Sequence, residues 1–448
     1  MPKPPPLSVT SSAEAPLDRA LGFAASGDAE WALRWAIPLA KADLSAAAPL
    51  LVLGKQLCAL DQGPSATLAL ETAADRAADG GNLPLAIAAL TELRLLGVDV
   101  STRADAIART YAKGSPRLRA GGAHPPPVAP PDVQALPATL SGAALVDAAL
   151  QIVEYARAAA ESDREQRSSL PQVPAQGIFS SLSHSALRAL IGAFDLKRVP
   201  KGEKVVEQGA PGAEAFVLAR GELEVVREQP EGDRMLLARL GNGAVFGEMA
   251  LLSRSPRTAS VVAARASLVL VIRVEALDEA ARISPEVGAA FAAYCHRRMV
   301  GNLVRTSPLL GPLSAGERQA LIERFSARTF ETGDRIITQG QESDGLHVIA
   351  SGELTVVRRD GEDEVVIANL GVGEVVGEVS LVFRRASNAD VVAAHPTMTL
   401  HLPRTRFMEI VREHPTLLAQ LYELAVKRDE ETASIVAQEA SDAEDLII

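Results

Sequence analysis

Residues 246–261 combine an arginine, an acid and several small residues in a spacing that could hold a compact anion. They read Phe-Gly-Glu-Met-Ala-Leu-Leu-Ser-Arg-Ser-Pro-Arg-Thr-Ala-Ser-Val. Arg257 offers a planar fork of N–H donors, and a short helix opening at Gly247 and Glu248 would add oriented backbone amides. Gly247 lets the backbone approach a ligand closely. Glu248 would repel the anion unless it accepts a hydrogen bond from the bound molecule.

This segment, the first cassette, resembles the phosphate-binding cassette of the cyclic-nucleotide-binding domain family. The family pattern is Phe-Gly-Glu-Leu-Ala-Leu, a short spacer and Pro-Arg-x-Ala-Thr/Ser-Val, and Met249 is the one departure from it. The resemblance covers about residues 177–430. It implies that Arg257 and the amides of Ala250 and Thr258 meet a cyclic phosphate. It also implies that Glu248 binds the ribose 2′-hydroxyl. The expected site residues are Gly247, Glu248, Met249, Ala250, Arg257, Thr258 and Ala259.

Thr258 bears on which cyclic nucleotide is bound. In the family, a Thr or Ser after the cassette arginine often accompanies a preference for cGMP, because its hydroxyl can bond the guanine 2-amino group. An alanine there is usual for cAMP. A threonine that simply suits the start of a strand explains this position equally well. Thr258 therefore favours cGMP slightly, and both ligands stay open.

The chain contains a second copy of the same unit. At an offset of 131 residues, Glu207–Arg227 and Thr338–Arg358 share 10 of 21 residues. Average residue usage gives about one or two identities by chance. Short β-branched or alternating runs bounded by turn residues predict an antiparallel β-roll, or jelly roll, in each copy.

The second cassette, residues 376–391, lacks the cation. Ser387 stands at the arginine position, and Asp390 is expected to add negative charge near the anion. Losing one bidentate charged contact costs roughly 3 kcal/mol, on the order of a hundredfold in affinity. Arg384 or Arg385 could substitute only by swinging in from a spacer that is expected to face outward. We therefore predict a degenerate second site formed by Gly377, Glu378, Ser380, Ser387 and Asn388.

The expected fold is α+β and multidomain, with an all-α N-terminal domain before the two β-rolls and their flanking helices. Ala/Leu-rich helical spacing predicts the first domain, and a Pro- and Gly-rich stretch predicts a linker after it. The predicted boundaries are 1–113 for the helical domain, 114–176 for the Pro-rich linker and connecting helix, 177–305 and 306–430 for the first and second cyclic-nucleotide-binding domains, and 431–448 for an acidic tail.

Composition excludes several other classes of protein. A net charge of -11 disfavours a general nucleic-acid or membrane surface. Two separated cysteines, Cys58 and Cys295, indicate buried thiols rather than a disulfide framework or a zinc site. The seven histidines show no metal-ligand spacing, so no metal is expected. No catalytic constellation is recognisable either, and we expect no enzyme. With no apolar run of membrane-spanning length, the expected location is cytoplasmic.

The leading functional hypothesis is a sensor for cAMP or cGMP that relays binding through the helices at 275–302 to a helical domain or partner. Its protein partner is unknown and could bind through residues 13–113, and a homo-oligomer is possible. A non-binding scaffold is the second hypothesis. A ligand-dependent transcription regulator is the third. The tail speaks against the third, because a helix at 415–427 and an acidic stretch leave no room for a basic recognition helix.

Overall fold

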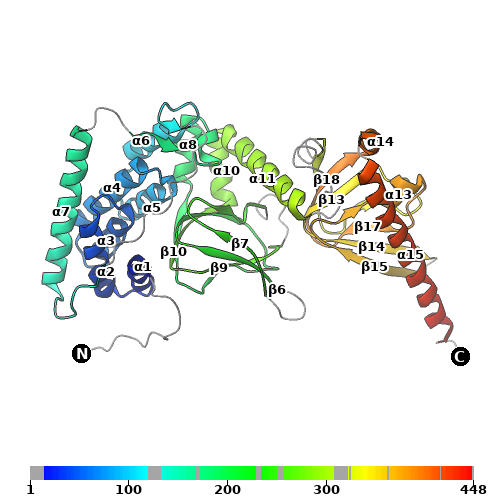
Figure 1. Cartoon of the computed structure of the whole chain (residues 1–448), viewed down its shortest axis with the longest axis horizontal. Coiled ribbons are helices and arrows are strands. Elements are labelled where there is room, and N and C mark those ends of the chain that lie inside the picture. The colour runs from blue at the N-terminus through cyan, green and yellow to red at the C-terminus, as the bar shows by residue number, and fades with distance from the viewer. Residues whose placement is uncertain are drawn as a thin grey trace. The chain divides into compact units, whose positions relative to one another are not determined.

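The structure is a computed structural model of the 448-residue chain. It describes residues 15–119, 133–166, 171–228, 234–249, 256–306, 321, 324–360, 363–413 and 415–445. The chain folds as two compact units (Figure 1). Unit 1 comprises residues 1–207, 215–246 and 259–290, and unit 2 comprises 208–214, 247–258 and 291–448. Most of the first cassette therefore groups with the C-terminal half of the chain.

Unit 1 begins with a layer of antiparallel helices, as the sequence predicts. Consecutive helices pack against one another through small side chains, and many of the buried residues are alanines. Asp28 and Asn82 cap two of the helices by accepting the amides of Trp31 and Leu85. The helices are α1 (Pro16–Ala25), α2 (Ala29–Ala42), α3 (Ala47–Ala59), α4 (Gly63–Asp79), α5 (Leu83–Leu95) and α6 (Ser101–Tyr111).

A long helix after the Pro-rich segment also belongs to this layer. The sequence treats this stretch as a connecting helix, but α7 (Ala143–Gln166) packs against α2, α3 and α4. Its buried stripe runs from Leu145 to Ala156, and Arg76 of α4 contacts Asp163 at 2.5 Å. The stripe has helical spacing, so the helix can bury one face on its neighbours.

The first roll consists of two four-stranded antiparallel sheets with orders β3-β10-β5-β8 and β4-β9-β6-β7. Apolar side chains, among them Phe216, Leu218 and Phe246, fill the space between the sheets. Two short strands, β1 (Leu118–Arg119) and β2 (Val173–Pro174), and α8 (His184–Gly192) precede the roll. The strands are β3 (Asp195–Val199), β4 (Lys204–Val206), β5 (Glu214–Arg220), β6 (Leu223–Glu228), β7 (Arg234–Leu240), β8 (Val245–Phe246), β9 (Ser260–Ala263) and β10 (Ser267–Arg273).

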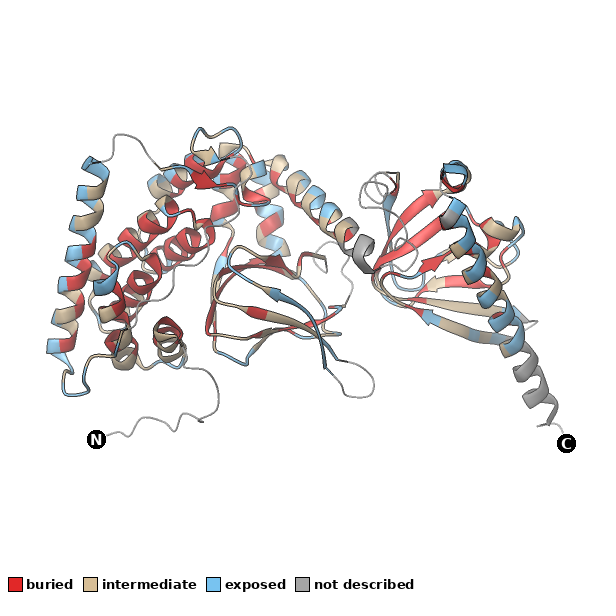
Figure 2. Cartoon of the chain, viewed as in Figure 1, coloured by how far each residue is buried: buried red, intermediate tan, exposed pale blue. Residues whose placement is uncertain are grey.

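The second roll repeats this topology, with orders β11-β18-β13-β16 and β12-β17-β14-β15. Buried residues concentrate on its strands, while α15 shows an exposed outer face (Figure 2). The elements are β11 (Ser326–Phe330), β12 (Arg335–Ile337), β13 (Gly345–Ser351), β14 (Leu354–Asp360), β15 (Asp363–Leu370), β16 (Val375–Val376), α13 (Glu378–Phe383), β17 (Asp390–Ala393), β18 (Thr397–Pro403), α14 (Arg404–Glu413) and α15 (Pro415–Asp445).

Two helical predictions need correction. The stretch expected as one helix at 275–302 is two helices, α10 (Val274–Ile283) and α11 (Pro285–Thr306), because a proline restarts the helix at its first position. The acidic tail is wrong over residues 431–445, because α15 continues through Asp445. Its alanines and glutamates are good helix formers, and their negative charge does not prevent the helix.

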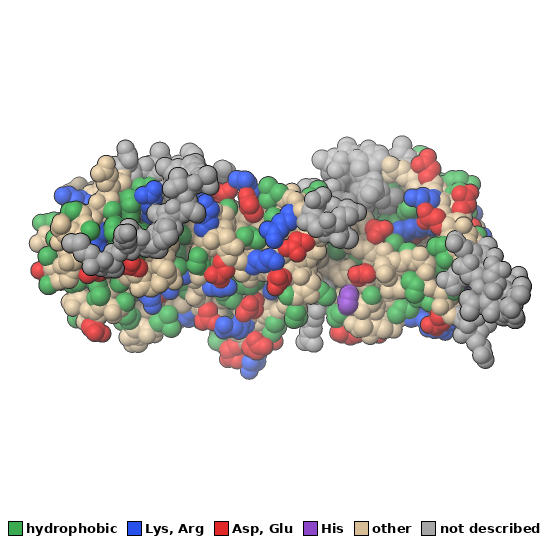
Figure 3. All heavy atoms as spheres, turned by 90° about the horizontal axis from the view of Figure 1, so that it is seen from below, with side chains coloured by type: hydrophobic (Ala, Val, Ile, Leu, Met, Phe, Trp, Pro, Cys, Tyr) green, Lys and Arg blue, Asp and Glu red, His purple; other side chains and the backbone are tan. Residues whose placement is uncertain are grey.

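The surface shows no single-sign field. On the face seen in Figure 3, Lys and Arg side chains lie among Asp and Glu side chains over the residues that are coloured. None of the helices that the structure describes is long and apolar enough to cross a lipid bilayer.

Candidate functional site

The first cassette holds Arg257 with its guanidinium inside the protein. Only 8% of the residue is exposed. Its Nη1 donates to the carbonyl of Gly247 at 2.7 Å, and its Nη2 donates to the carbonyl of Glu214 at 2.9 Å. Burial lowers the pKa of Arg257, while Glu214 and Glu248 act in the opposite direction. A cation is thus fixed among neutral acceptors that a phosphate could replace.

Glu248 connects the cassette directly to α11. The residue is 3% exposed, and its Oε1 lies 3.2 Å from Nε of Arg298 on α11. Burial raises the pKa of Glu248, while Arg298 and Arg257 act to lower it. One residue turn away on the same helix, the Cys295 thiol donates to the Glu248 carbonyl at 3.9 Å. Any ligand that engages Glu248 therefore acts on a group that already binds α11.

The remaining residues of the predicted first site have different environments. Gly247 has a φ of 74°, a conformation that favours glycine. Met249 packs against the apolar cluster that includes Met299. Ala259 is buried, whereas Thr258 is exposed. Ala250 lies outside the described residues. The structure therefore brings Gly247, Glu248 and Arg257 together, and leaves the Thr258 side chain at the surface.

The second cassette begins α13 in the same way, but a different arginine supplies its cation. Gly377 has a φ of 92°, and a side chain there would collide with the carbonyl of Gly345. Glu378, 2% exposed, forms an ion pair with Nη1 of Arg428 on α15 at 2.8 Å. Arg428 also donates to the carbonyl of Val375. The charge on Arg428 is therefore used to neutralise the acid of the cassette.

A cavity of about 630 Å³ lies between this cassette and α15. All five residues of the predicted second site line it, together with Leu424, Arg428 and Thr432 of α15. Two buried polar atoms in this lining, Oε2 of Glu378 and Oγ of Ser387, have no hydrogen-bond partner. The cavity has the size of a small-molecule site, yet Ser387 contributes a hydroxyl where the first cassette has a guanidinium.

Asp390 does not have the role expected for it. Its carboxylate accepts the amide of Gln339 at 2.8 Å and lies 3.6 Å and 3.4 Å from Nε of Arg335 and Arg359. It does not line the cavity. The expectation that Asp390 adds charge at the anion position is therefore wrong, because its strand turns that side chain toward cations on neighbouring strands.

The two spacer arginines do not replace the missing cation in this structure. Arg385 pairs with Asp429 of α15 and lies over the ring of Phe383. Arg384 has a φ of 52° and ends α13. Neither arginine lines the 630 Å³ cavity. As expected for a spacer facing outward, both side chains are exposed.

Arg298 and Arg428 are the functional residues that sequence reasoning missed. The two cassette acids, Glu248 and Glu378, are 130 positions apart, and so are the two arginines. Each arginine pairs with the acid of its own cassette. Extending the internal repeat into the helices after each roll would have found this pair, because the same offset holds there.

Comparison with known proteins agrees with this geometry. The family model described as cyclic nucleotide-binding domain matches residues 196–283 and 327–414. The cAMP-dependent protein kinase regulatory subunit of Yarrowia lipolytica is 27% identical over 234 residues, which cover 52% of this chain and 58% of that protein. The type II regulatory subunit of Drosophila melanogaster is 28% identical over 216 residues, covering 48% and 54%. The match thus spans little more than half the length of these curated relatives.

Solved structures of the same kind are also similar. The regulatory domain of Toxoplasma gondii PKA with cAMP is 22% identical, with 56% of this chain and 92% of that chain covered and a TM-score of 0.29. The regulatory subunit of a cAMP-independent protein kinase A from Trypanosoma cruzi, bound to guanosine, is 20% identical, with 59% and 91% covered and a TM-score of 0.28. The assignment rests on the two family-model matches and on the cassettes. The chain belongs to the cyclic-nucleotide-binding domain family and carries two tandem copies of the domain.

Proposed function

We propose that the chain is a regulatory protein that binds cAMP or cGMP in its first roll and responds by rearranging α11. The observation that carries this proposal is the ion pair between Glu248 of the cassette and Arg298 of α11, at 3.2 Å. The same acid is the group that, by family resemblance, meets the ribose. One carboxylate therefore belongs both to the ligand site and to the helix that would transmit the signal.

Binding would change the partners of both charged groups. The phosphate would accept hydrogen bonds from Arg257 in place of the carbonyls of Gly247 and Glu214, and charge-assisted bonds are about twice as strong as neutral ones. A ribose hydroxyl on Glu248 would compete with Arg298. A ligand shifts a conformational equilibrium only by its difference in affinity for the two states, and this competition supplies such a difference.

We propose that the second roll does not bind a cyclic nucleotide with comparable affinity. Ser387 cannot supply a charge, and the nearby guanidinium of Arg428 already pairs with Glu378. The cavity beside them supports a retained pocket without the phosphate contact. One nucleotide per chain is the expected stoichiometry.

The partner we propose is a protein kinase, because the relatives reported above are named as regulatory subunits of cAMP-dependent protein kinases. The chain itself would regulate rather than catalyse, and it would act inside the cell, where such kinases work. The helical layer of unit 1 is the surface we propose for this contact. A scaffold that binds no nucleotide is the alternative function.

Hydrogen exchange of α11, followed by mass spectrometry, tests the relay. Saturating cAMP or cGMP should change the exchange of α11 amides in the wild type. Arg298→Gln should change α11 exchange before any ligand is added and should reduce the response to ligand. Arg297→Gln is the matched control, because Arg297 is the neighbouring, exposed arginine of the same helix.

Two results would contradict the proposal in different ways. Nucleotide binding without any change in α11 would remove the relay and leave a binding protein. No binding of either nucleotide to the wild type would remove the sensor function and favour the scaffold.

A further inference from the structure

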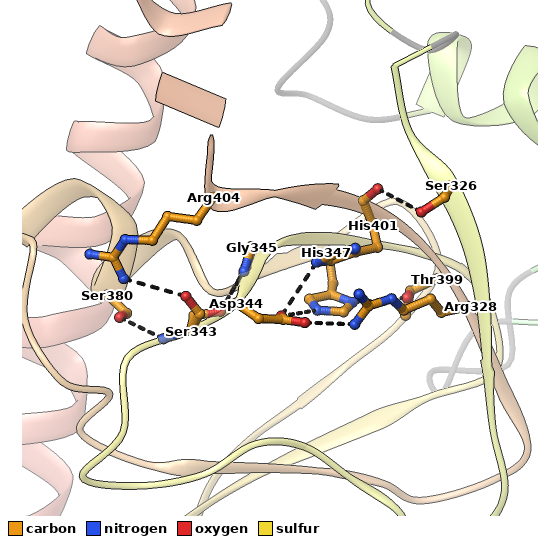
Figure 4. Close-up of polar contacts among 10 residues, drawn as sticks. All are labelled: Ser326, Arg328, Ser343, Asp344, Gly345, His347, Ser380, Thr399, His401 and Arg404. Atoms are coloured by element: carbon orange, nitrogen blue, oxygen red, sulfur yellow. Dashed lines mark hydrogen bonds and ion pairs between the residues drawn. The ribbon is translucent and has the colours of Figure 1, made fainter. Parts of the chain in front are cut away.

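Two buried histidines and an aspartate meet in the second roll, away from its cassette. One ligand atom each from Asp344, His347 and His401 lie within 4.8 Å of one another. Nε2 of His347 is 3.2 Å and Nε2 of His401 is 3.3 Å from the same atom, Oδ1 of Asp344. Figure 4 shows the carboxylate reaching from the loop before β13 toward the imidazoles. The sequence expectation that the histidines are scattered is wrong here.

The pairing of two strands creates this cluster. His347 on β13 and His401 on β18 are directly opposite each other in an antiparallel ladder, so both side chains lie on the same face of the sheet. Their ring centroids are 4.5 Å apart. Asp344 immediately precedes β13, and its carbonyl accepts the amide of Arg404 at 2.9 Å, which fixes the start of that strand.

Both imidazoles are buried and available as ligands. Their side chains are 1% and 2% exposed. Burial lowers the pKa of His347 to about 4 and also lowers that of His401, so both rings are neutral at physiological pH. Nδ1 of His347 lies 3.0 Å from Oγ1 of Thr399, which fixes the ring and leaves Nε2 facing Asp344. Neither ring nitrogen of His401 has a hydrogen bond.

We propose that Asp344, His347 and His401 bind one divalent transition-metal ion, for which Zn²⁺ is the best match. Two imidazole nitrogens and one carboxylate oxygen form a ligand set that zinc uses in proteins, with a further position open. A buried imidazole without a hydrogen bond is costly, and a metal would satisfy it. The Thr399 contact is the type of outer partner that orients a metal-bound histidine.

The surroundings of the cluster permit an ion to enter. Half of the Asp344 side chain is exposed, so the carboxylate provides access from solvent. Gly345 has no side chain, and a Cβ at this position would collide with Nε2 of His401. Arg328 holds the other carboxylate oxygen, Oδ2, at 2.6 Å. Its charge opposes a cation but orients Oδ1 toward the histidines, so we expect moderate rather than extreme affinity.

Zinc titration of the full-length, tag-free and EDTA-treated protein tests the site. Calorimetry should show one Zn²⁺ bound per chain, and Co²⁺ in its place should give the visible absorption of a low-symmetry site with nitrogen ligands. Asp344→Asn and His401→Gln should each weaken Zn²⁺ binding at least about 100-fold, because even partners outside the ligand set are worth 10–100-fold. His395→Gln, which changes an exposed histidine of the same roll, should bind as the wild type does.

Asp344→Asn decides the outcome if His401→Gln does not fold, because its side chain is largely exposed and outside the core; circular dichroism checks the fold of both variants. Loss of the Co²⁺ spectrum and of Zn²⁺ binding in Asp344→Asn, with both retained in His395→Gln, would support the site. Absence of Zn²⁺ binding in the wild type, or undiminished binding in Asp344→Asn, would overturn it.

Discussion

The two cassettes differ in where their guanidinium comes from. In the first, Arg257 belongs to the cassette and donates to backbone carbonyls. In the second, Arg428 comes from α15 and pairs with the cassette acid, while Ser387 leaves its hydroxyl without a partner. Single residues therefore separate a site prepared for an anion from one that has lost its anion contact.

Thr258→Ala tests the base preference at this scale. The exposed hydroxyl of Thr258 is free to meet the guanine 2-amino group, so the variant should bind cGMP about 2–10-fold more weakly, the range of one neutral hydrogen bond. Binding of cAMP should stay unchanged. Competition binding with both nucleotides measures the ratio, and an equal change for cAMP and cGMP would contradict a role in base selection.

Glu248 gives a pH dependence whose sign follows from its environment. Because burial raises its pKa, the folded protein holds the proton more tightly than the unfolded chain does. The free energy of unfolding should therefore fall as pH rises from 4.5 through the raised pKa, and then level off. Glu248→Gln should remove this part of the slope.

Urea unfolding at a series of pH values measures the difference between wild type and Glu248→Gln. The exposed Glu275→Gln serves as the control and should keep the wild-type slope. Identical pH profiles for wild type and Glu248→Gln would show that Glu248 does not titrate as its burial requires.

At the scale of elements, each roll is followed by a helix that reaches back to its cassette. Arg298 of α11 and Arg428 of α15 make equivalent ion pairs. In the second roll this helix also lines the cavity and carries Asp429, which pairs with Arg385. The helix after each roll is therefore a part of the site rather than a connection.

Arg428→Ala should destabilise the second roll. Removing one member of a buried pair leaves an uncompensated charge on Glu378, which costs about 3–5 kcal/mol. Urea unfolding should show this loss, whereas the adjacent, exposed Lys427→Ala should stay within about 0.5 kcal/mol of wild type. The double variant Arg428→Ala with Glu378→Gln should recover part of the loss, and no recovery would mean that the pair is not the cause.

The sequence predicts these elements unevenly. The strands of the rolls follow from β-branched runs such as 223–227, and the observed β6 agrees closely. The pairing of His347 with His401 depends on the register of β13 and β18, which are more than 50 residues apart, and no local pattern reveals it. The direction of Asp390 and the reach of Arg428 likewise arise from tertiary packing.

At the scale of the molecule, buried ion pairs join the helical layer of unit 1 to the strands of the first roll. Asp18 of α1 is buried against Arg265 of that roll at 2.7 Å, and Glu92 of α5 pairs with Arg198 of β3. Burial lowers the pKa of Arg220, another neighbour of Asp18, to about 10. The repeated region and the helical layer are therefore not independent domains, a point that composition alone does not predict.

Asp18→Ala should loosen this attachment. It leaves Arg220 buried beside Arg265 without their shared carboxylate, and we expect a loss of about 3 kcal/mol in the free energy of unfolding of unit 1. Chemical unfolding measures it, with the exposed Glu165→Ala as the control for removal of an acid. A change no larger than that of Glu165→Ala would mean that the attachment does not depend on Asp18.

The central claim is that one cyclic nucleotide binds per chain, at Arg257. Calorimetric titration of cAMP and cGMP into the wild type, Arg257→Ala and the exposed-arginine control Arg239→Ala tests it most directly. We predict one bound nucleotide per chain for the wild type and the control, and a loss of at least about 100-fold in affinity for Arg257→Ala. Two bound nucleotides per chain, or wild-type affinity in Arg257→Ala, would contradict the claim.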